Sequence, residues 1–187
     1  MVAKPPRTPA SYADLQLLPP NAVGEIIAGT LYASPRPASP HAAASSALGE
    51  ELGPPFKRGR GGPGGWIILD EPELHLRDDV LVPDLAGWRR ERMPEMPVAP
   101  AFVMAPDWAC EVLSPSTAVI DRSEKMPVYA RERVGHVWLV DPVLRTLELF
   151  RLDGEGYRVV ATWHDDARVR AEPFDALELE LGVLWAR

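Results

Sequence analysis

Three residues of this 187-residue chain carry side chains suited to cleaving a phosphate ester with a metal ion: Asp84, Glu111 and Lys125. Carboxylate oxygens are the ligands that Mg²⁺ and Mn²⁺ prefer, and these ions keep several bound waters. Such an ion polarises a phosphate oxygen and lowers the pKa of a coordinated water. A neighbouring lysine can orient that water and offset charge developing on the phosphate. The backbone carbonyl of Val112, next to Glu111, is a further candidate ligand.

Both carboxylates interrupt apolar runs. Glu111 lies within residues 108–113, which are otherwise typical of a buried strand. Because burying an unpaired charge is costly, Glu111 requires a partner or a metal ion. The pattern predicts one strand over residues 80–88, where Asp84 shares an otherwise apolar face, since alternate residues point the same way. Taken alone, Asp84 could be a turn or strand-end residue. Taken alone, Lys125 could be the solvent-facing partner of Asp121, and an exposed pair of this kind contributes little stability.

Lys125 belongs to a helix that we expect to begin at Asp121 and to end near Gly135. Asp121 is followed three residues later by a glutamate, which is the spacing of a capping box. A four-residue helical step places Asp121 and Tyr129 next to Lys125, where they could support it. Pro127 lies past the first turn and removes a backbone hydrogen bond, so the pattern leaves the direction of the Lys125 side chain open.

Three more residues could assist such a site. Glu25 lies on a predicted hairpin, although a strand-end surface residue fits its position equally well. His41 lies on the first turn of a predicted helix, where it could contact phosphate or simply be solvated. Glu73 opens a predicted hairpin whose register is not fixed by the sequence, so it faces Asp84 in only some registers.

The elements that must position these residues are short and are separated by prolines and glycines. We expect helices at 11–15 and 41–52, a hairpin within 24–34, and strands at 66–69, 73–76, 80–88 and 108–113. From residue 136 onward, four strand-like runs predict an antiparallel meander, and the tail is either an edge strand or a cover over the sheet. Residues 1–10 are predicted to form a flexible arm.

Residues 53–65 are rich in glycine and proline, and we expect a flexible loop without a regular element. Its basic residues leave two interpretations open, a solvated connection or a loop that follows a phosphate backbone. Together the elements predict a single α/β domain over residues 1–187. Its mixed, largely antiparallel sheet would be flanked by two main helices, with Asp84 and Glu111 on adjacent strands.

Composition narrows the class of protein. A net charge of -7 argues against broad electrostatic binding to nucleic acid, but not against a nuclease with an acidic metal site. The single cysteine, Cys110, excludes an internal disulfide and a cysteine-built zinc site, and we expect it in the core. No signal-peptide core or membrane-spanning run is present, so we expect a cytoplasmic protein.

Several stretches resemble one known family. They are VLVPDL, PDWACEVLSPST, DRSEKMPVYA and HVWLVDP, together with GEIIAGTLYASP and SPH at 39–41. They are similar to the Uma-two family of proposed endonucleases, which is assigned to the PD-(D/E)XK, restriction-endonuclease-like superfamily. The similarity spans roughly residues 11–152. A strict superfamily motif has lysine two residues after Glu111, where this chain has Leu113.

The resemblance implies a restriction-endonuclease-like fold and a role for each residue. Asp84 takes the place of the PD aspartate, Glu111 that of the second acid, and Lys125 that of a lysine moved to the following helix. It also implies Mg²⁺ or Mn²⁺ as cofactor, nucleic acid (in particular DNA) as substrate, and a homodimer, since two sites can cut two strands. Two alternatives stay open: a non-catalytic binding or regulatory module that retains the fold, and a metal-dependent phosphoesterase acting on small nucleotides.

Overall fold

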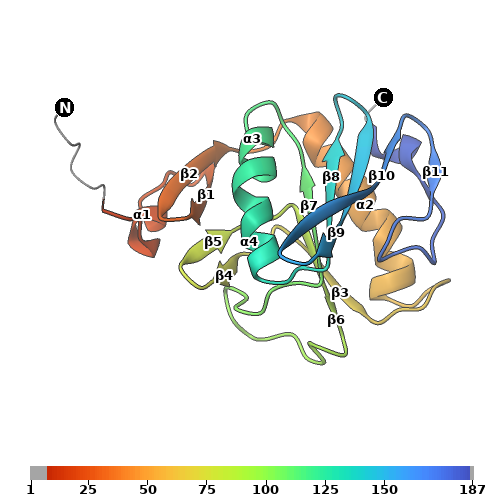
Figure 1. The fold of residues 1–187 in the computed structure, drawn as a ribbon, viewed down its shortest axis with the longest axis horizontal. Coiled ribbons are helices and arrows are strands. Elements are labelled where there is room, and N and C mark those ends of the chain that lie inside the picture. Colours follow the sequence, from red (N-terminus) through yellow and green to blue (C-terminus); the bar gives the residue numbers. More distant parts are fainter. Residues whose placement is uncertain (1–7, 186–187) are drawn as a thin grey trace.

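A six-stranded sheet runs through the centre of the computed structural model, which describes residues 8–185 (Figure 1). Its strand order is β10-β9-β8-β7-β6-β3, and every neighbouring pair is antiparallel except β7 and β8. The strands are β3 (Trp66–Asp70), β6 (Leu85–Arg89), β7 (Trp108–Val112), β8 (His136–Asp141), β9 (Thr146–Asp153) and β10 (Gly156–His164). The predicted mixed, largely antiparallel sheet and its C-terminal meander β8–β9–β10 are confirmed.

A second sheet of four strands lies beside the first. Its antiparallel order is β2-β1-β5-β4, from the strands β1 (Ala22–Ile27), β2 (Thr30–Pro35), β4 (Leu74–Leu76) and β5 (Asp79–Leu81). The hairpin predicted within 24–34 is confirmed as β1–β2. Its two turn residues, Ala28 and Gly29, have φ of 49° and 72°, and two positive φ values produce the twist that a two-residue hairpin needs.

The prediction of one strand over residues 80–88 is wrong. β5 and β6 belong to different sheets, and the chain crosses from one to the other between Leu81 and Leu85. Pro83 lies in this crossing, where its missing N–H costs no ladder hydrogen bond. Asp84 is therefore not on the apolar face of a strand. It lies at the seam between the two sheets, immediately before β6.

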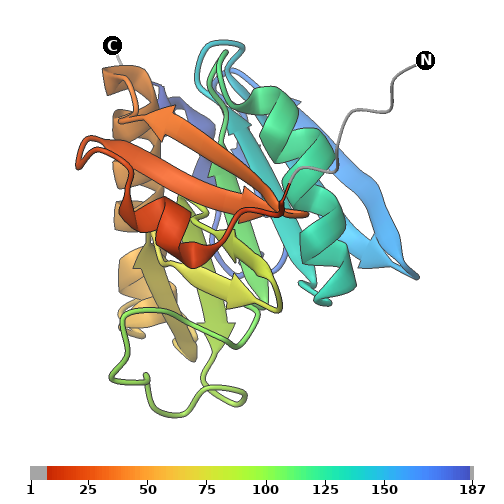
Figure 2. The same cartoon turned by 90° about the vertical axis from the view of Figure 1, so that its left-hand side faces the viewer.

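The sheet separates two apolar cores, as expected from side chains that alternate along a strand. On one side, Trp108 and Cys110 of β7 pack with helix α2 (Ser39–Leu52) and the C-terminal segments. On the other side, Ala109 packs with helix α4 (Met126–Arg131) and the four-stranded sheet. Figures 1 and 2 show α2 and α4 on opposite sides of the sheet. Glu111 shares the face of Ala109 and therefore points toward the helix that carries Lys125.

The helix that carries Lys125 starts earlier than expected. It begins with α3 (Ala118–Ile120), continues through a π-helical turn (Asp121–Lys125) and ends with α4 at Arg131. The predicted capping box at Asp121 is wrong, because Thr117 precedes the first turn and Asp121 lies inside the helix. The π-helical turn immediately precedes Pro127, which lacks the donor for an ordinary α-helical hydrogen bond.

Residues 53–57 are not the irregular loop that their composition predicts. They extend α2 as a π-helical turn, in which Pro55 and Phe56 are buried. The Phe56 ring lies 4.7 Å from that of Phe174 between centroids, so aromatic packing holds the segment against the core. Residues 58–65 contain no helix or strand, as predicted.

Replacing Phe56 by leucine should lower the free energy of unfolding by about 1–2 kcal/mol, because the change removes ring contacts from a filled core. Urea unfolding followed by circular dichroism measures the loss. The neighbouring exposed Lys57→Ala should change the same quantity by less than about 0.5 kcal/mol. Equal values for the two variants would contradict the docking of this turn.

The C-terminal part of the chain departs from prediction in one place. Only Arg168–Val169 of the predicted strand at 168–174 forms a strand, β11, which pairs with β12 (Leu179–Glu180) in a sheet of their own. Phe174 instead packs against Trp108 and Trp138, so this segment covers the core. The first helix is confirmed as α1 (Tyr12–Gln16), and the tail after β12 forms a 3₁₀ turn (Leu181–Leu184) near α2. Most of the predicted arm lies outside the described residues.

No helix within residues 8–185 is long and apolar enough to span a bilayer. The tryptophans at 66, 88, 108 and 138 and the single cysteine are all buried, as expected of core residues.

Candidate active site

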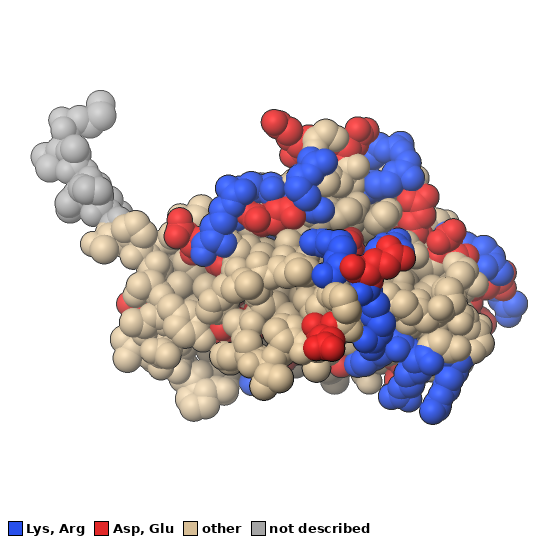
Figure 3. Space-filling model, turned by 90° about the horizontal axis from the view of Figure 1, so that it is seen from below, with Lys and Arg blue, Asp and Glu red and all other residues tan. Residues whose placement is uncertain are grey.

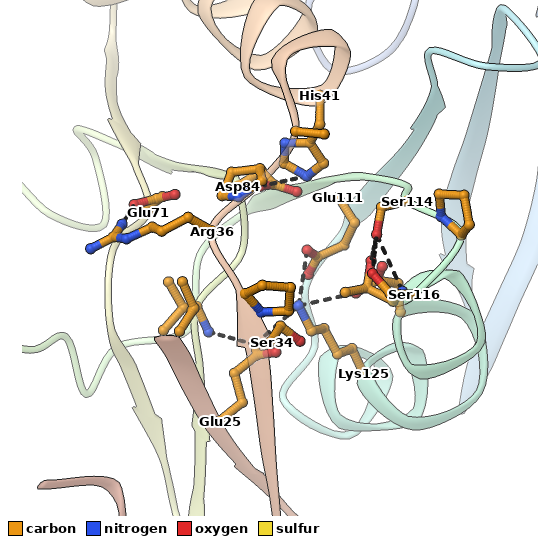
Figure 4. A pocket seen from close by; sticks show the side chains of 18 residues that line it. Glu25, Ser34, Arg36, His41, Glu71, Asp84, Glu111, Ser114, Ser116 and Lys125 are labelled. Atoms are coloured by element: carbon orange, nitrogen blue, oxygen red, sulfur yellow. Dashed lines mark hydrogen bonds and ion pairs between the residues drawn. The ribbon is translucent and has the colours of Figure 1, made fainter. Parts of the chain in front are cut away.

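The ammonium of Lys125 lies among three carboxylates (Figure 4). Its Nζ is 3.0 Å from Glu25 Oε1, 3.1 Å from Glu111 Oε2 and 3.1 Å from Asp121 Oδ1. Lys125 is only 4% exposed, so its interpretation as a solvent-facing partner of Asp121 is wrong. The structure thus answers the question left open by Pro127, because the lysine points toward Glu111.

Each carboxylate around Lys125 comes from a different element. Glu25 is on β1, Glu111 is on β7, and Asp121 lies one helical turn before the lysine. Glu25 Oε1 also accepts the backbone N–H of Val82 at 2.8 Å, which ties β1 to the crossing between the sheets. Lys125 therefore links both sheets and the helix at a single point.

Glu111 is held by two donors. Besides Lys125, the hydroxyl of Tyr129 donates to Glu111 Oε1 at 2.5 Å. Burial raises the pKa of Glu111 well above its ordinary value, although Lys125 opposes this, and the neighbouring Asp121, Asp84 and Glu25 raise it further. Burial also raises the pKa of Tyr129, with Glu111 adding to the effect, so the hydroxyl stays a donor.

Asp84 lies beside Glu111 because of the strand register. β6 pairs Leu85 with Cys110, so the residue before β6 falls next to the residue after Cys110. Asp84 Oδ2 accepts the N–H of Val112 at 2.7 Å. In an extended strand the N–H and C=O of one residue point to the same side. The Val112 carbonyl therefore faces the side of β7 on which the Asp84 carboxylate lies.

His41 reaches the site from the first turn of α2. Its Nε2 lies 3.2 Å from Asp84 Oδ1, and its Nδ1 is buried. Burial lowers the pKa of His41, but the ion pair with Asp84 outweighs burial and leaves the pKa above its ordinary value. His41 is thus not simply solvated.

A pocket of about 290 Å³ lies at the seam of the two sheets, and its lining includes Glu25, His41, Asp84, Glu111, Asp121 and Lys125. It also contains residues that the sequence did not single out: Ser34, Arg36, Glu71, Ser114, Ser116 and Thr117. Arg36 and Glu71 form an ion pair of 3.4 Å at its edge. The proline-rich stretch around Arg36 has no periodicity that could have indicated this position. The hydroxyl-rich run after β7 was interpreted only as the end of a strand.

Glu73 is not part of the pocket. Its Oε1 accepts the hydroxyl of Tyr12 at 2.9 Å and lies 2.6 Å from His75 Nε2. Of the two registers left open, the structure has the one in which Glu73 does not face Asp84, because these contacts hold its side chain just before β4, near α1. All the other candidate residues are brought together.

The pocket suits a divalent cation in charge and in chemistry. Three carboxylates, those of Glu25, Glu111 and Asp121, share Lys125, and a fourth, Asp84, pairs with His41, so acids outnumber cations. Within residues 8–185, no three His, Cys, Asp or Glu side chains form a ready-made metal site. Mg²⁺ does not require one, because it uses one or two carboxylates and keeps several waters. Asp84, Glu111 and the Val112 carbonyl form an oxygen donor set of that kind.

Tyr129→Phe should lower the free energy of unfolding by about 1.5–3 kcal/mol, since it removes a buried hydrogen bond to a charged group. Tyr157→Phe is a matched control, because Tyr157 donates to a neutral acceptor, the Val134 carbonyl, at 2.6 Å. We expect about 0.5–1.5 kcal/mol for this control. Urea unfolding of both variants tests the difference. A larger loss for Tyr157→Phe would show that Glu111 does not depend on the tyrosine.

With this geometry established, the chain was compared with known proteins. A family model described as "Putative restriction endonuclease" matches residues 9–183. The chain belongs to the Uma2 family. The resemblance expected from the sequence is thereby confirmed, and it extends beyond residues 11–152. A search of curated proteins found no match.

A solved structure shares the fold of this Uma2 protein. It is the crystal structure of a protein from Anabaena variabilis ATCC 29413, described as a putative nuclease belonging to DUF820. The sequences are 24% identical, the TM-score is 0.71, and the match covers 95% of this chain and 98% of the other. The likeness at this identity shows a common fold, in agreement with the predicted restriction-endonuclease-like architecture.

Proposed function

We propose that this Uma2 protein is a metal-dependent nuclease that hydrolyses phosphodiester bonds in the pocket around Asp84 and Glu111. The proposal rests mainly on the position of Lys125, whose ammonium lies 3.1 Å from Glu111. Glu111 is on β7, and Asp84 immediately precedes the neighbouring strand β6. Two acids and a lysine in one pocket supply the charges that phosphodiester hydrolysis needs. The family model, described as "Putative restriction endonuclease", supports the same reaction class.

Asp84, Glu111 and the Val112 carbonyl would hold Mg²⁺ or Mn²⁺. When bound, such an ion polarises a phosphate oxygen and lowers the pKa of a coordinated water. Lys125 orients the attacking water and offsets charge developing on the phosphate. The pKa of Lys125 is raised well above its ordinary value, because Glu111, Glu25 and Asp121 outweigh the effect of burial. The lysine therefore stays positively charged throughout the physiological pH range.

Four other residues keep this arrangement in place. Glu25 and Asp121 fix the ammonium of Lys125 from two sides. Tyr129 holds the second oxygen of Glu111, and so limits rotation of its carboxylate. His41 pairs with Asp84 from α2 and sets the orientation of that carboxylate. Fixed donors of this kind cost little reorganisation when charge develops during the reaction.

The proposal is tested by incubating the purified protein with Mg²⁺ or Mn²⁺ and a panel of DNA and RNA substrates. We expect cleavage that EDTA abolishes and that either ion restores. Hydrolysis of a mononucleotide diester without cleavage of any oligonucleotide would favour a phosphoesterase of small nucleotides. Metal-independent binding of nucleic acid without cleavage would favour a non-catalytic module. In either case the nuclease proposal would be lost.

A further inference from the structure

A second hollow of about 750 Å³ opens directly from the candidate active site. Its lining includes His41, Asp84, Glu71 and Pro37, all of which also line the first pocket, so the two hollows form one continuous groove. From this shared end the groove follows the length of α2. It ends at Lys57 and Arg58, which close the π-helical turn after α2.

The floor of the groove is made by small residues on one face of α2. They recur at helical spacing on the face opposite to the buried Ala44, Leu48 and Leu52: Ala42, Ser45, Ser46, Gly49 and Gly53. The other wall is the end of β3. A Cβ added at Gly49 would lie 3.3 Å from Asp70 Oδ1, so the helix approaches that wall closely. Apart from Glu50, the residues that α2 contributes to the groove between Ala42 and Gly53 are small.

Charge is unevenly distributed along the groove. The acids Glu71 and Asp84 lie at the active-site end, where Arg36 pairs with Glu71, and Asp70 lies midway, beside Gly49. Glu50 is the acid on the helical wall, and both exposed cations of the lining, Lys57 and Arg58, lie at the far end. Seen from below, Lys and Arg side chains gather, with acids among them, on the half of the molecule where α2 ends in Figure 1, although the net charge is -7 (Figure 3).

We propose that this groove holds a polynucleotide strand, whose backbone runs from the Asp84–Glu111 pocket along α2 and places a phosphate between Lys57 and Arg58. The inference rests on the proposed function, which puts the scissile phosphate at the acidic end. The acids near the reaction centre repel an unbound phosphate chain, and the cations at the far end attract it. Binding is therefore anchored away from the site of cleavage.

The length of the groove sets the length of the strand. Lys57 follows His41 by sixteen residues of helix, which is about 24 Å at about 1.5 Å per residue. One strand of a duplex advances about 3.4 Å per nucleotide, so about seven nucleotides separate the scissile phosphate from the anchoring phosphate. A mononucleotide or dinucleotide cannot reach Lys57 and Arg58. The substrate class is thus a polymer, cut within the chain or at least seven nucleotides from one end.

Fluorescence anisotropy with labelled oligonucleotides of two to twenty nucleotides, single-stranded and duplex, tests the groove in EDTA. We expect wild-type affinity to rise until about seven nucleotides and then to level off. The variant Lys57→Glu/Arg58→Glu should bind the longer strands at least about tenfold more weakly. The slope of the logarithm of the association constant against the logarithm of the salt concentration should also become less steep by about 1.4–1.8, the value for two phosphate contacts. Glu50→Gln, on the same groove, should bind about two- to threefold more tightly.

The matched control is Arg158→Glu/Arg168→Glu, which makes the same change of charge at exposed positions outside the groove. Equal weakening in both double variants would overturn the proposal that the strand binds in this groove. Affinity that does not depend on oligonucleotide length beyond two nucleotides would overturn it as well. Hydrolysis of bis(p-nitrophenyl) phosphate separates this outcome from failure of the proposed function. That small diester does not reach Lys57, so the groove variants should hydrolyse it at the wild-type rate. If wild type cleaves no diester with Mg²⁺ or Mn²⁺ but keeps length-dependent binding, the proposed nuclease activity is contradicted and the proposed binding groove is supported.

Discussion

Lys125→Met is expected to abolish nucleic-acid cleavage and to lower the free energy of unfolding by about 3–5 kcal/mol. The substitution keeps a long side chain but removes the cation that contacts Glu25, Glu111 and Asp121. Removing one partner of a buried ion pair leaves uncompensated charge, and costs of this size are typical. Lys125 is also the group that we propose to orient the attacking water, so the variant that still folds should not cleave.

The loss of stability in Lys125→Met should increase with pH. Burial already holds the pKa of Glu111 and Glu25 above the ordinary value of 4.5, and the loss of Lys125 removes the contact that lowers both. A carboxyl group whose pKa is raised by folding binds a proton more tightly in the folded state. Such a group stabilises the folded state fully below pH 4.5, and this stabilisation is lost as the pH rises through the raised pKa. Urea unfolding at pH 5 and pH 8 should therefore show the larger deficit at pH 8.

Lys57→Met is the control for this experiment, because it makes the same chemical change at an exposed position. We expect it to alter the free energy of unfolding by less than about 0.5 kcal/mol at either pH. A deficit of under about 1 kcal/mol for Lys125→Met, with no dependence on pH, would show that the three carboxylates do not rely on the lysine.

Asp84→Asn is expected to lower kcat/KM for cleavage at least about a thousandfold while the fold stays intact. An asparagine oxygen can still accept the N–H of Val112, but the amide has no charge with which to hold a divalent cation. A thousandfold change corresponds to about 4 kcal/mol of transition-state stabilisation, which is within the range attributed to a catalytic metal. Circular dichroism and the unfolding midpoint should match those of wild type.

Glu71→Gln is the matched variant for Asp84→Asn. Glu71 lines the same pocket and loses the same charge, but it pairs with Arg36 at the edge and not with His41 and Val112 beside Glu111. We expect kcat/KM within about threefold of wild type. Equal losses in both variants would mean that the overall negative charge of the pocket matters, and not the carboxylate beside Glu111.

The features predicted from local pattern were those with a clear energetic anomaly. Glu111 was recognisable because a charge inside an apolar strand must have a partner. The residue is 1% exposed, and Lys125 and Tyr129 both donate hydrogen bonds to its carboxylate. Asp121 and Tyr129 were predicted as neighbours of Lys125 because a four-residue helical step fixes them. The participation of Glu25 was only one of two open interpretations, since strand β1 approaches Lys125 through tertiary packing alone.

What could not be predicted depends on contacts between distant segments. Residues 80–88 have the alternation of one strand, yet the chain changes sheets at Pro83, and only the complete fold determines where each half pairs. The composition of residues 53–57 predicts a loop, but Phe56 finds a partner in Phe174 more than a hundred residues later. The start of the helix at Ala118 was missed because Asp121 mimics a cap while its carboxylate is used by Lys125.

Calorimetric titration with Mn²⁺ tests the central claim most directly, because it detects the metal site independently of any substrate. We predict one binding event per chain in wild type, and its loss in both Asp84→Asn and Glu111→Gln. Glu71→Gln should retain it. The absence of binding to wild type, or binding that is unchanged in the Asp84 and Glu111 variants, would contradict a metal-dependent site at this pocket.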